Sequence, residues 1–397
     1  MKEWFDYYVE RRGTDSSKWN LEAMKNMGGY ADEDSIPMWV ADMDFKSPRI
    51  ILEKLKERID HGILGYSGPT AGYYESLIHW FSKRQGWNIE KDWVITTPGV
   101  VPALYYLIQA LTEKGEGVII QTPVYYPFKR AIVNTGRVVV ENQLKEEKNK
   151  YTIDFEDLKK KAAQADTKLM ILCSPHNPIG KVWTREELEQ INDICKKNGV
   201  VLISDEIHSD LILFDTNFVS VGALCQEIAE NTIICTAPSK TFNIAGLQTS
   251  NIVIKNKALR EKMNEYLLTI SGRTTPNLFG NVALQAAYSP EGEEWLDELR
   301  EYLEENYLFI IEFLKEKLPD IAWSPLEGTY LLWLDFRNLS SYTCAEELEK
   351  KVAEVAKLVL DGGSIFGECG QGFMRMNIAC PRPVIQEALD RLYNTFK

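Results

Sequence analysis

The chain contains few of the residues that bind metals or cross-link small folds. It has seven cysteines and four histidines in 397 residues. The cysteine count is odd and no pair forms Cys-x-x-Cys, so we expect neither a disulfide framework nor a zinc site, and we predict no bound metal. Cys173, Cys195 and Cys235 lie in apolar segments and are predicted to be small buried side chains.

Long hydrophobic runs are also missing. No apolar stretch approaches the roughly 18 residues that a membrane-spanning helix needs, so we expect no membrane partner. The first residues, MKEWFDYYVERR, are charged and aromatic and lack the apolar core of a secretory signal. We therefore expect a cytoplasmic protein in a reducing compartment.

Positive charge is in the minority. Lys and Arg number 45 against 58 Asp and Glu, which gives a formal net charge of −13. This balance argues against nucleic acid as a partner, because the phosphate backbone is itself negative. The hydrophobic share of 45% and the charged share of 26% are typical of a globular protein, and the length predicts two to three domains.

Short apolar strands alternate with helices through much of the chain. The alternation predicts helices at 101–113 and 184–199 and strands at 93–96, 117–121, 168–173, 200–204 and 232–235. Strands that are apolar on both faces indicate a mostly parallel sheet sandwiched by helices.

The pattern changes near residue 290. A long charged helix is followed by two strands and two helices, which predicts a smaller α+β layer. We therefore predict an α/β protein with a large domain at 47–288. A small α+β domain is predicted to combine residues 1–46 with residues 289–397.

Chemically useful side chains follow the predicted strands. In chain order the strands lead to a glycine turn and helix start at Val100, then to Tyr125, Asn177, Asp205 and Lys240. Because the carboxyl ends of parallel strands meet at one edge of a sheet, these residues are expected to converge. A phosphate site at a helix N-terminus, an aromatic ring, an amide, a carboxylate and a lysine are what pyridoxal phosphate requires.

Each of these residues has a plainer interpretation when it is taken alone. Lys240 is typical of a solvated helix end, and Asp205 is typical of a helix cap. Tyr125 is typical of core packing, and His208 is typical of a satisfied structural histidine. Only the joint order along the chain favours a cofactor site.

Five motifs resemble those of a known family. They are Trp39-Val-Ala-Asp-Met-Asp-Phe45, Gly65-Tyr-Ser-Gly-Pro69, Ser174-Pro-His-Asn-Pro-Ile-Gly180, Ser204-Asp-Glu-Ile-His208 and Ala237-Pro-Ser-Lys-Thr-Phe-Asn-Ile-Ala-Gly246. Over nearly the whole chain the sequence resembles fold-type-I pyridoxal-phosphate enzymes, the aspartate aminotransferase superfamily. Within it, the sequence is similar to the cystathionine β-lyase/cystalysin branch of carbon–sulfur lyases. The resemblance implies the PLP-dependent transferase fold of type I.

The resemblance implies a role for each matching residue at the cofactor. Lys240 matches the catalytic lysine that bonds to the cofactor, Asp205 the partner of the ring nitrogen, and Asn177 the donor to the ring oxygen. The other implied cofactor contacts are Tyr125 and Ile207 on the two ring faces, Val100, Val101 and Ser239 at the phosphate, and His208, whose role stays open.

Substrate binding and assembly are also implied by the resemblance. Arg375 matches the arginine that binds the substrate α-carboxylate, with Trp39 and Asn177 near the substrate. Tyr66 matches a tyrosine that reaches substrate and phosphate in the neighbouring subunit, which implies a homodimer with shared active sites. Either Tyr125 or Tyr126 is expected to assist proton transfer to the leaving sulfur, and the sequence does not choose between them.

Two departures bear on the reaction. Gln248 stands where many aminotransferases carry an arginine, and His208 stands where they usually carry a tyrosine; both favour the lyase branch. The expected function is α,β-elimination of L-cystathionine or a related L-cysteine S-conjugate, giving pyruvate, ammonia and a thiol. The alternatives are a PLP-dependent aminotransferase and, as a lesser alternative, a PLP-fold protein with an added regulatory binding role.

Overall fold

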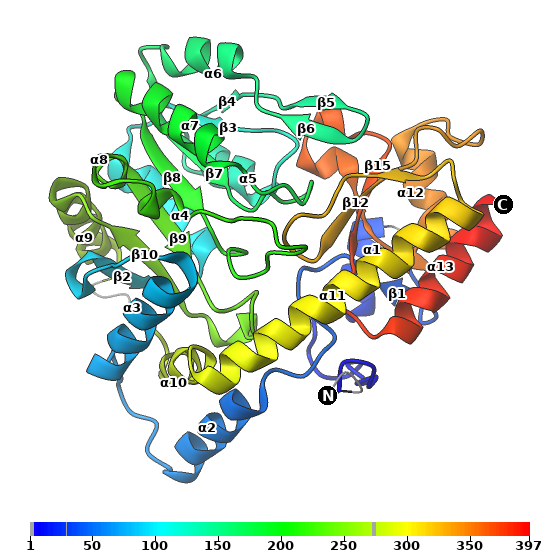
Figure 1. Ribbon diagram of the computed structural model, residues 1–397, viewed down its shortest axis with the longest axis horizontal. Coiled ribbons are helices and arrows are strands. Elements are labelled where there is room, and N and C mark those ends of the chain that lie inside the picture. Colours follow the sequence, from blue (N-terminus) through cyan, green and yellow to red (C-terminus); the bar gives the residue numbers. More distant parts are fainter. Residues whose placement is uncertain (1–3, 29, 272–274) are drawn as a thin grey trace.

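Two sheets of different kinds organise the chain (Figure 1). The structure is a computed structural model that describes residues 4–28, 30–271 and 275–397. A seven-stranded sheet has the order β2-β10-β9-β8-β7-β3-β4. Its strands are β2 (Val94–Thr97), β3 (Gly117–Ile120), β4 (Val138–Glu141), β7 (Thr167–Cys173), β8 (Val201–Asp205), β9 (Thr232–Thr236) and β10 (Ser250–Ile254). Only β10 runs antiparallel to its neighbours, so the sheet is mostly parallel, as predicted.

The strands of this sheet are apolar on both faces because helices cover both. A hydrophobic cluster lies on each face of the sheet. Along β7, Leu169 and Ile171 belong to the first cluster, while Met170 and Leu172 belong to the second. The first cluster includes side chains of α4 (Val100–Leu111), α5 (Pro127–Asn134) and α9 (Lys257–Ser271). The second cluster includes side chains of α6 (Phe155–Ala162) and α7 (Arg185–Lys197). The pattern of burial thus explains the near-continuous apolar runs in the sequence.

Further elements extend this layer. Helices α3 (Ala71–Gln85) and α10 (Leu278–Ala287) pack together, and α2 (Arg49–Asp60) packs against α10. In Figure 1, α2 and the segment that leads from it to α3 project from the lower edge of the molecule. The short helix α8 (Gln226–Ala229) and the exposed hairpin of β5 (Lys145–Glu147) and β6 (Lys150–Thr152) complete it, while the short helix α1 (Leu21–Gly28) packs against α12 (Ala345–Glu354) and β13 (Leu358–Val359) of the other layer.

The second sheet is antiparallel and four-stranded. Its order is β11 (Ala322–Trp323), β12 (Leu331–Asp335), β15 (Phe373–Asn377) and β14 (Asp361–Gly362). Helix α11 (Pro290–Lys317) runs diagonally across the molecule with α13 (Arg382–Phe396) beside it (Figure 1). These elements form the predicted α+β layer.

The two ends of the chain meet in this layer. Strand β1 (Ile36–Pro37) pairs in parallel with β13 (Leu358–Val359). The sequence pattern predicts a helix over 344–358, but α12 ends earlier (Ala345–Glu354) because Leu358 belongs to that strand pair. Phe5 is also buried in its own chain, against Phe45 and Tyr302 at ring-centroid distances of 5.1 and 5.3 Å.

The predicted fold class is confirmed by this architecture and by the comparisons given below. The predicted domain boundaries stay a prediction, and residues 1–3 of the small domain lie outside the described residues. Among the helices that the structure describes, none has the length and apolar character needed to cross a membrane.

Asn306 ties α11 to the end of the small sheet. Its amide donates to the carbonyls of Ile378 and Cys380 at 3.1 Å each, and its Oδ1 accepts from Arg382 Nε at 2.7 Å. Asn306→Ala leaves these buried groups without partners and should lower the free energy of unfolding by about 2–3 kcal/mol. Urea denaturation measures this, with the exposed Glu301→Ala as the matched control on the same helix. Equal stability of the two variants would contradict the assignment.

Candidate active site

A cavity of about 180 Å³ lies at the carboxyl edge of the large sheet. Strands β2, β7, β8 and β9 all end at this edge, which is why residues far apart in the sequence meet there. Its lining includes Ala41, Gly99, Val100, Val101, Tyr125, Asn177, Asp205, Ile207, His208, Ser239, Lys240, Gln248 and Thr249. The structure thus brings together most of the residues that the sequence singled out.

Lys240 follows β9 and enters the cavity from the turn that begins at Ala237. Its Nζ donates to the carbonyl of Ala41 at 2.6 Å. Burial lowers the pKa of this amine to about 8, although the negative charge of Asp42 opposes the shift. A lysine with this pKa has a large neutral fraction near pH 7–8, which a nucleophile or base needs.

Asp205 ends β8 and is buried at the cavity wall. One carboxylate oxygen, Oδ1, accepts from the backbone N–H of Ile207 at 3.1 Å. Burial raises the pKa of this carboxyl group to about 7, against the effects of the Ile207 hydrogen bond and of Lys240. A cation placed against Asp205 would therefore be needed to keep it fully ionised.

The start of α4 provides an anion site. Gly99 caps the twelve-residue helix without a side-chain hydrogen bond, so the first-turn N–H groups at Val100 and Val101 face the cavity without helical acceptors. The positive end of the helix dipole favours a phosphate there. Ser239 lies on the same cavity, as does Gln248, whose backbone is left-handed at φ 46°.

The aromatic and amide residues come from the turns after β3 and β7. The backbone N–H of Tyr125 donates to the carbonyl of Asn177 at 3.0 Å, which joins the two turns. The Tyr125 ring lies 5.5 Å from that of Tyr126. His208 is buried, and burial holds its pKa well below the usual value, so its ring is neutral and packs edge-on against Tyr330 at 5.8 Å.

The segment 39–45 covers Lys240 and is held by side chains from distant strands and turns. Asn377 donates to the carbonyls of Val40 and Asp42 at 2.7 and 2.6 Å. Asn243 donates to the carbonyls of Met43 and Phe45 at 2.9 and 2.8 Å. Tyr330 donates to the carbonyl of Ala41 at 2.9 Å, the same oxygen that accepts from Lys240.

Ion pairs also hold residues 39–45 in place. Asp44 is buried and accepts from Lys18 Nζ at 2.7 Å, Trp19 Nε1 at 2.9 Å and Arg11 Nη1 at 2.7 Å. Burial alone would raise the pKa of Asp44, but its cationic and N–H partners bring that pKa below the usual value. Asp42 forms an ion pair with Arg11 at 2.7 Å. Residues 39–45, which form the wall over Lys240, are therefore held at both Asp42 and Asp44.

Arg375 is buried on β15 and points toward the turn that carries Asn177. Its Nη1 donates to Asn177 Oδ1 at 3.0 Å, and its Nη2 donates to the carbonyl of Trp39 at 2.7 Å and forms an ion pair with Asp361. The Trp39 indole packs instead beside Met24 and donates to the carbonyl of Lys18. Trp39 therefore brings its carbonyl to the site, and its indole is not among the residues that line the cavity.

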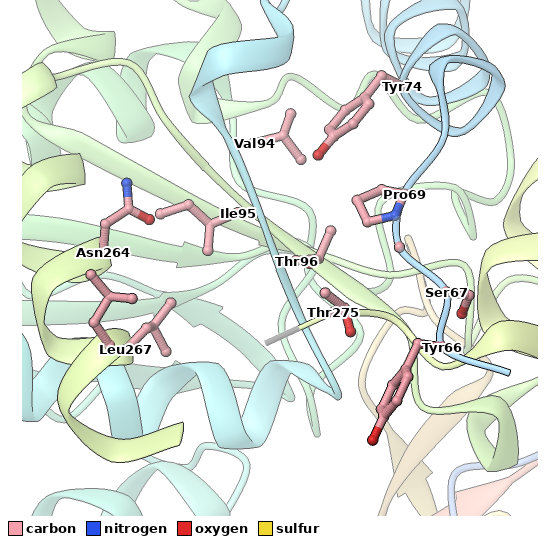
Figure 2. Close-up of a pocket in the computed structure, with 12 residues that line it drawn as sticks. Tyr66, Ser67, Pro69, Tyr74, Val94, Ile95, Thr96, Asn264, Leu267 and Thr275 are labelled. Carbon is pink, nitrogen blue, oxygen red and sulfur yellow. The ribbon is translucent and has the colours of Figure 1, made fainter. Parts of the chain in front are cut away.

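Tyr66 does not lie in the cavity of its own chain. Its side chain is fully exposed, and it lines a separate pocket of about 690 Å³. Figure 2 shows Tyr66 and Pro69 on one side of this pocket, across from Asn264 and Leu267 of α9. Tyr126 is half-buried beside Tyr125 and is not among the residues that line the cavity either.

Sequence reasoning missed three residues that shape the site: Tyr330, Asp361 and Asn377. Their hydrogen bonds to Ala41, Arg375 and Val40 all join positions that are far apart in sequence or in different strands. Asp361 had no local signal. Asn377 had a weak one, because it is a polar residue at the end of the apolar run Phe-Met-Arg-Met.

The donor set fits pyridoxal phosphate. The cavity combines a lysine of lowered pKa, a buried carboxylate that needs a cationic partner, and free N–H groups at a helix start. These are the three groups that bind the aldehyde, the ring nitrogen and the phosphate of that cofactor. The fold and the site together define a fold-type-I enzyme that uses it.

Comparisons with known proteins agree with this class. The family model described as aminotransferase class I and II matches residues 35–392. The chain is 41% identical to "Cystathionine beta-lyase PatB" of Bacillus subtilis (strain 168), with 98% of each chain covered. Among solved structures, cystalysin of Treponema denticola, whose structure contains pyridoxal 5'-phosphate, is 40% identical with 98% of each chain covered and a TM-score of 0.94. The PLP-bound C–S lyase of Staphylococcus hominis is 34% identical, covering 99% of this chain and 97% of its own, with a TM-score of 0.90.

The chain therefore belongs to the class I and II aminotransferase family. The resemblance to the fold-type-I superfamily and to its carbon–sulfur lyase branch is confirmed.

The lowered pKa of Lys240 is open to direct measurement. In protein freed of cofactor, acetylation of Lys240 should rise with pH around a midpoint of about 8, because burial favours the neutral amine. Peptide mass spectrometry after a brief pulse of acetic anhydride measures this, with the exposed Lys56 as the internal control. A midpoint for Lys240 as high as that of Lys56 would show that the amine is not desolvated.

Proposed function

We propose that this protein is a pyridoxal-phosphate-dependent carbon–sulfur β-lyase that acts on L-cystathionine or related L-cysteine S-conjugates. The cavity that joins Lys240, Asp205 and the start of α4 is the observation that carries the proposal. The reaction type rests on the similarity to cystathionine β-lyase, cystalysin and a C–S lyase over nearly the full chain.

The residues of the cavity divide the binding of the cofactor between them. Lys240 would bond to its aldehyde carbon, and Asp205 would pair with its ring nitrogen. Val100, Val101 and Ser239 would hold its phosphate. Asn177 would donate to the ring oxygen, and Tyr125 and Ile207 would pack on the two faces of the ring, with His208 beside them.

When bound, pyridoxal phosphate supplies an electron sink that stabilises negative charge at the substrate Cα. Lys240, as a neutral amine, would take the proton from Cα, for which its lowered pKa suits it. The bond between Cβ and sulfur then breaks, and the sulfur leaves as a thiol after it receives a proton. Asp205, when paired with the ring nitrogen, would keep its negative charge in a buried site, which would strengthen its effect.

Arg375 would bind the substrate α-carboxylate, and the fork of its guanidinium group suits that anion. Nη1 donates to Asn177 Oδ1, and Asn177 lines the cavity, so a carboxylate bound beside Asn177 would also lie close to Nη1. Burial raises the pKa of both Tyr125 and Tyr126, so their hydroxyl groups are protonated at neutral pH and can donate a hydrogen bond toward the sulfur.

The choice of reaction is tested with two substrate mixtures. Purified holoenzyme should form pyruvate and thiol from L-cystathionine at least about tenfold faster than it forms glutamate from aspartate plus 2-oxoglutarate. A coupled lactate dehydrogenase assay measures pyruvate, and thiol reagent measures the released sulfur compound. Lys240→Ala is the control, and it should abolish both the turnover and the cofactor absorbance that depends on the covalent bond.

Rapid glutamate formation without pyruvate would instead identify an aminotransferase. Full turnover by Lys240→Ala would contradict the assignment of the lysine itself.

We infer that the protein works as a homodimer with shared active sites. Several large apolar side chains are exposed along α2, the segment after it and the end of α9, namely Leu52, Ile59, Ile63, Leu64, Tyr66 and Leu268. A single globular chain rarely exposes such a patch. A second copy placed there would bury it and would bring Tyr66 toward the partner's phosphate site.

The dimer is tested by placing one charge on the patch. Leu64→Glu should shift the protein from dimer to monomer in sedimentation velocity, because an interface buries that side chain. Leu308→Glu is the matched control, since Leu308 is equally exposed, at 56% against 59%, but lies on α11. A wild-type monomer with full activity would contradict the shared-site proposal.

The cytoplasmic location predicted from the sequence is part of the same proposal. All seven cysteines are free, which suits a reducing compartment.

A further inference from the structure

The register of the small sheet places an acidic residue directly beside Arg375. Strands β14 and β15 are antiparallel, and Asp361 is the residue opposite Arg375 in that pairing. Opposite residues share one face of a sheet, so the two side chains are neighbours by backbone geometry. Each residue is only 2% exposed.

The hydrogen bonds of Arg375 show which part of its guanidinium group remains open. Nη2 uses both of its hydrogens, one toward Asp361 and one toward the carbonyl of Trp39. Nη1 donates one hydrogen to Asn177 and keeps the other, while Nε is buried without a partner. The ring of Phe366 lies 5.0 Å from the guanidinium carbon and packs against the group. Arg375 is itself not among the residues that line the cavity, but Asn177 is, so the free Nη1 hydrogen beside the Asn177 amide is the part of Arg375 that adjoins a cavity residue.

Asp361 is the only carboxylate that forms an ion pair with Arg375 among the described residues. Burial raises the pKa of Asp361 to about 6, while the charge of Arg375 and its hydrogen bond oppose that rise, so Asp361 is mainly ionised at neutral pH. Without this carboxylate, Nη2 would have only the Trp39 carbonyl as an acceptor. The orientation of the guanidinium plane would then be fixed by one hydrogen bond of Nη2 instead of two.

We propose that Asp361 is a positioning residue for substrate binding: it holds Nη2 of Arg375 so that Nη1 and Asn177 together face the substrate α-carboxylate. This inference rests on the proposed function of Arg375. The direction in which substrate affinity changes when Asp361 is removed distinguishes this positioning role from a purely electrostatic one. Removal of a negative charge beside Arg375 would by itself strengthen the attraction for a carboxylate, whereas loss of alignment weakens binding.

The experiment measures ligand binding by the holoenzyme rather than turnover. L-Alanine, which has no leaving group at Cβ, is titrated while the cofactor absorbance is followed. Ethylamine, which lacks the carboxylate, is the matched probe. The proteins are wild type, Asp361→Ala, Arg375→Leu and the double variant, since a double-mutant cycle isolates the interaction between the two residues.

Asp361→Ala should raise the Kd of L-alanine by about 10- to 50-fold, which lies within the range expected for coupled neighbouring residues. The Kd of ethylamine should stay within about twofold of wild type, because that ligand does not use Arg375. The double variant should bind L-alanine as Arg375→Leu does, since Asp361 acts through the arginine. The absorbance of the bound cofactor should be unchanged.

Four outcomes would overturn the inference: an unchanged or lower Kd of L-alanine in Asp361→Ala, an equal rise for ethylamine, full additivity in the double variant, or loss of the cofactor absorbance. If one of these outcomes is found while Arg375→Leu still weakens the binding of L-alanine strongly, only the role of Asp361 is overturned. If Arg375→Leu leaves that Kd unchanged, the carboxylate role of Arg375 is overturned as well.

Asp361→Asn covers the case in which the alanine variant does not fold. The amide oxygen still accepts from Nη2, so the Kd of L-alanine should rise less than in Asp361→Ala, and again without a change for ethylamine. A fall in that Kd would show that Asp361 weakens the arginine electrostatically rather than aligning it.

Discussion

One buried hydrogen bond, from Arg375 to Asn177, connects the two sheets of this protein. Arg375 belongs to the central strand β15 of the antiparallel sheet, and Asn177 follows β7 of the parallel one. Both side chains are nearly inaccessible to water, which makes a bond with a charged donor strong and its loss costly. The amide that contacts the arginine also lines the cofactor cavity. In the proposed reaction, the relative position of the two sheets would therefore set the distance between the cofactor and the substrate carboxylate.

The second constraint is that residues 39–45 cross the cavity without regular pairing to either sheet. Their carbonyl groups still need hydrogen-bond donors, and side chains supply them. Asn377 and Tyr330 do so from the small sheet, and Asn243 does so from the turn after Lys240. The wall over the lysine is thus built from groups of both layers, so its geometry depends on their contact rather than on the segment itself.

The sequence was most informative where the chain is locally simple. Each buried strand is a short apolar run, and in a parallel sheet the strand ends meet at one edge, so the order along the chain pointed to Asp205 at the end of β8 and to Lys240 shortly after β9. Strand β10 was missed because no local pattern shows that Ser250–Ile254 enters between β2 and β9 in the opposite direction. The sequence also did not show that the Trp39 carbonyl accepts a hydrogen bond from Arg375, since a sequence motif identifies a side chain and not a backbone acceptor. Asp361 depends on strand register, which is set by tertiary contacts.

The meeting of distant parts of the chain has a consequence for the order of folding. Strand β1 pairs with β13 more than 300 residues later, and the wall over Lys240 is fixed by Asn377, close to the end of the chain. Contacts between such distant residues form late, because long loops must close first. Residues 94–254 contain every strand of the parallel sheet, but the segment that covers Lys240 takes hydrogen bonds from Tyr330 and Asn377, which lie outside that range. A complete cofactor pocket therefore requires the folding of both layers.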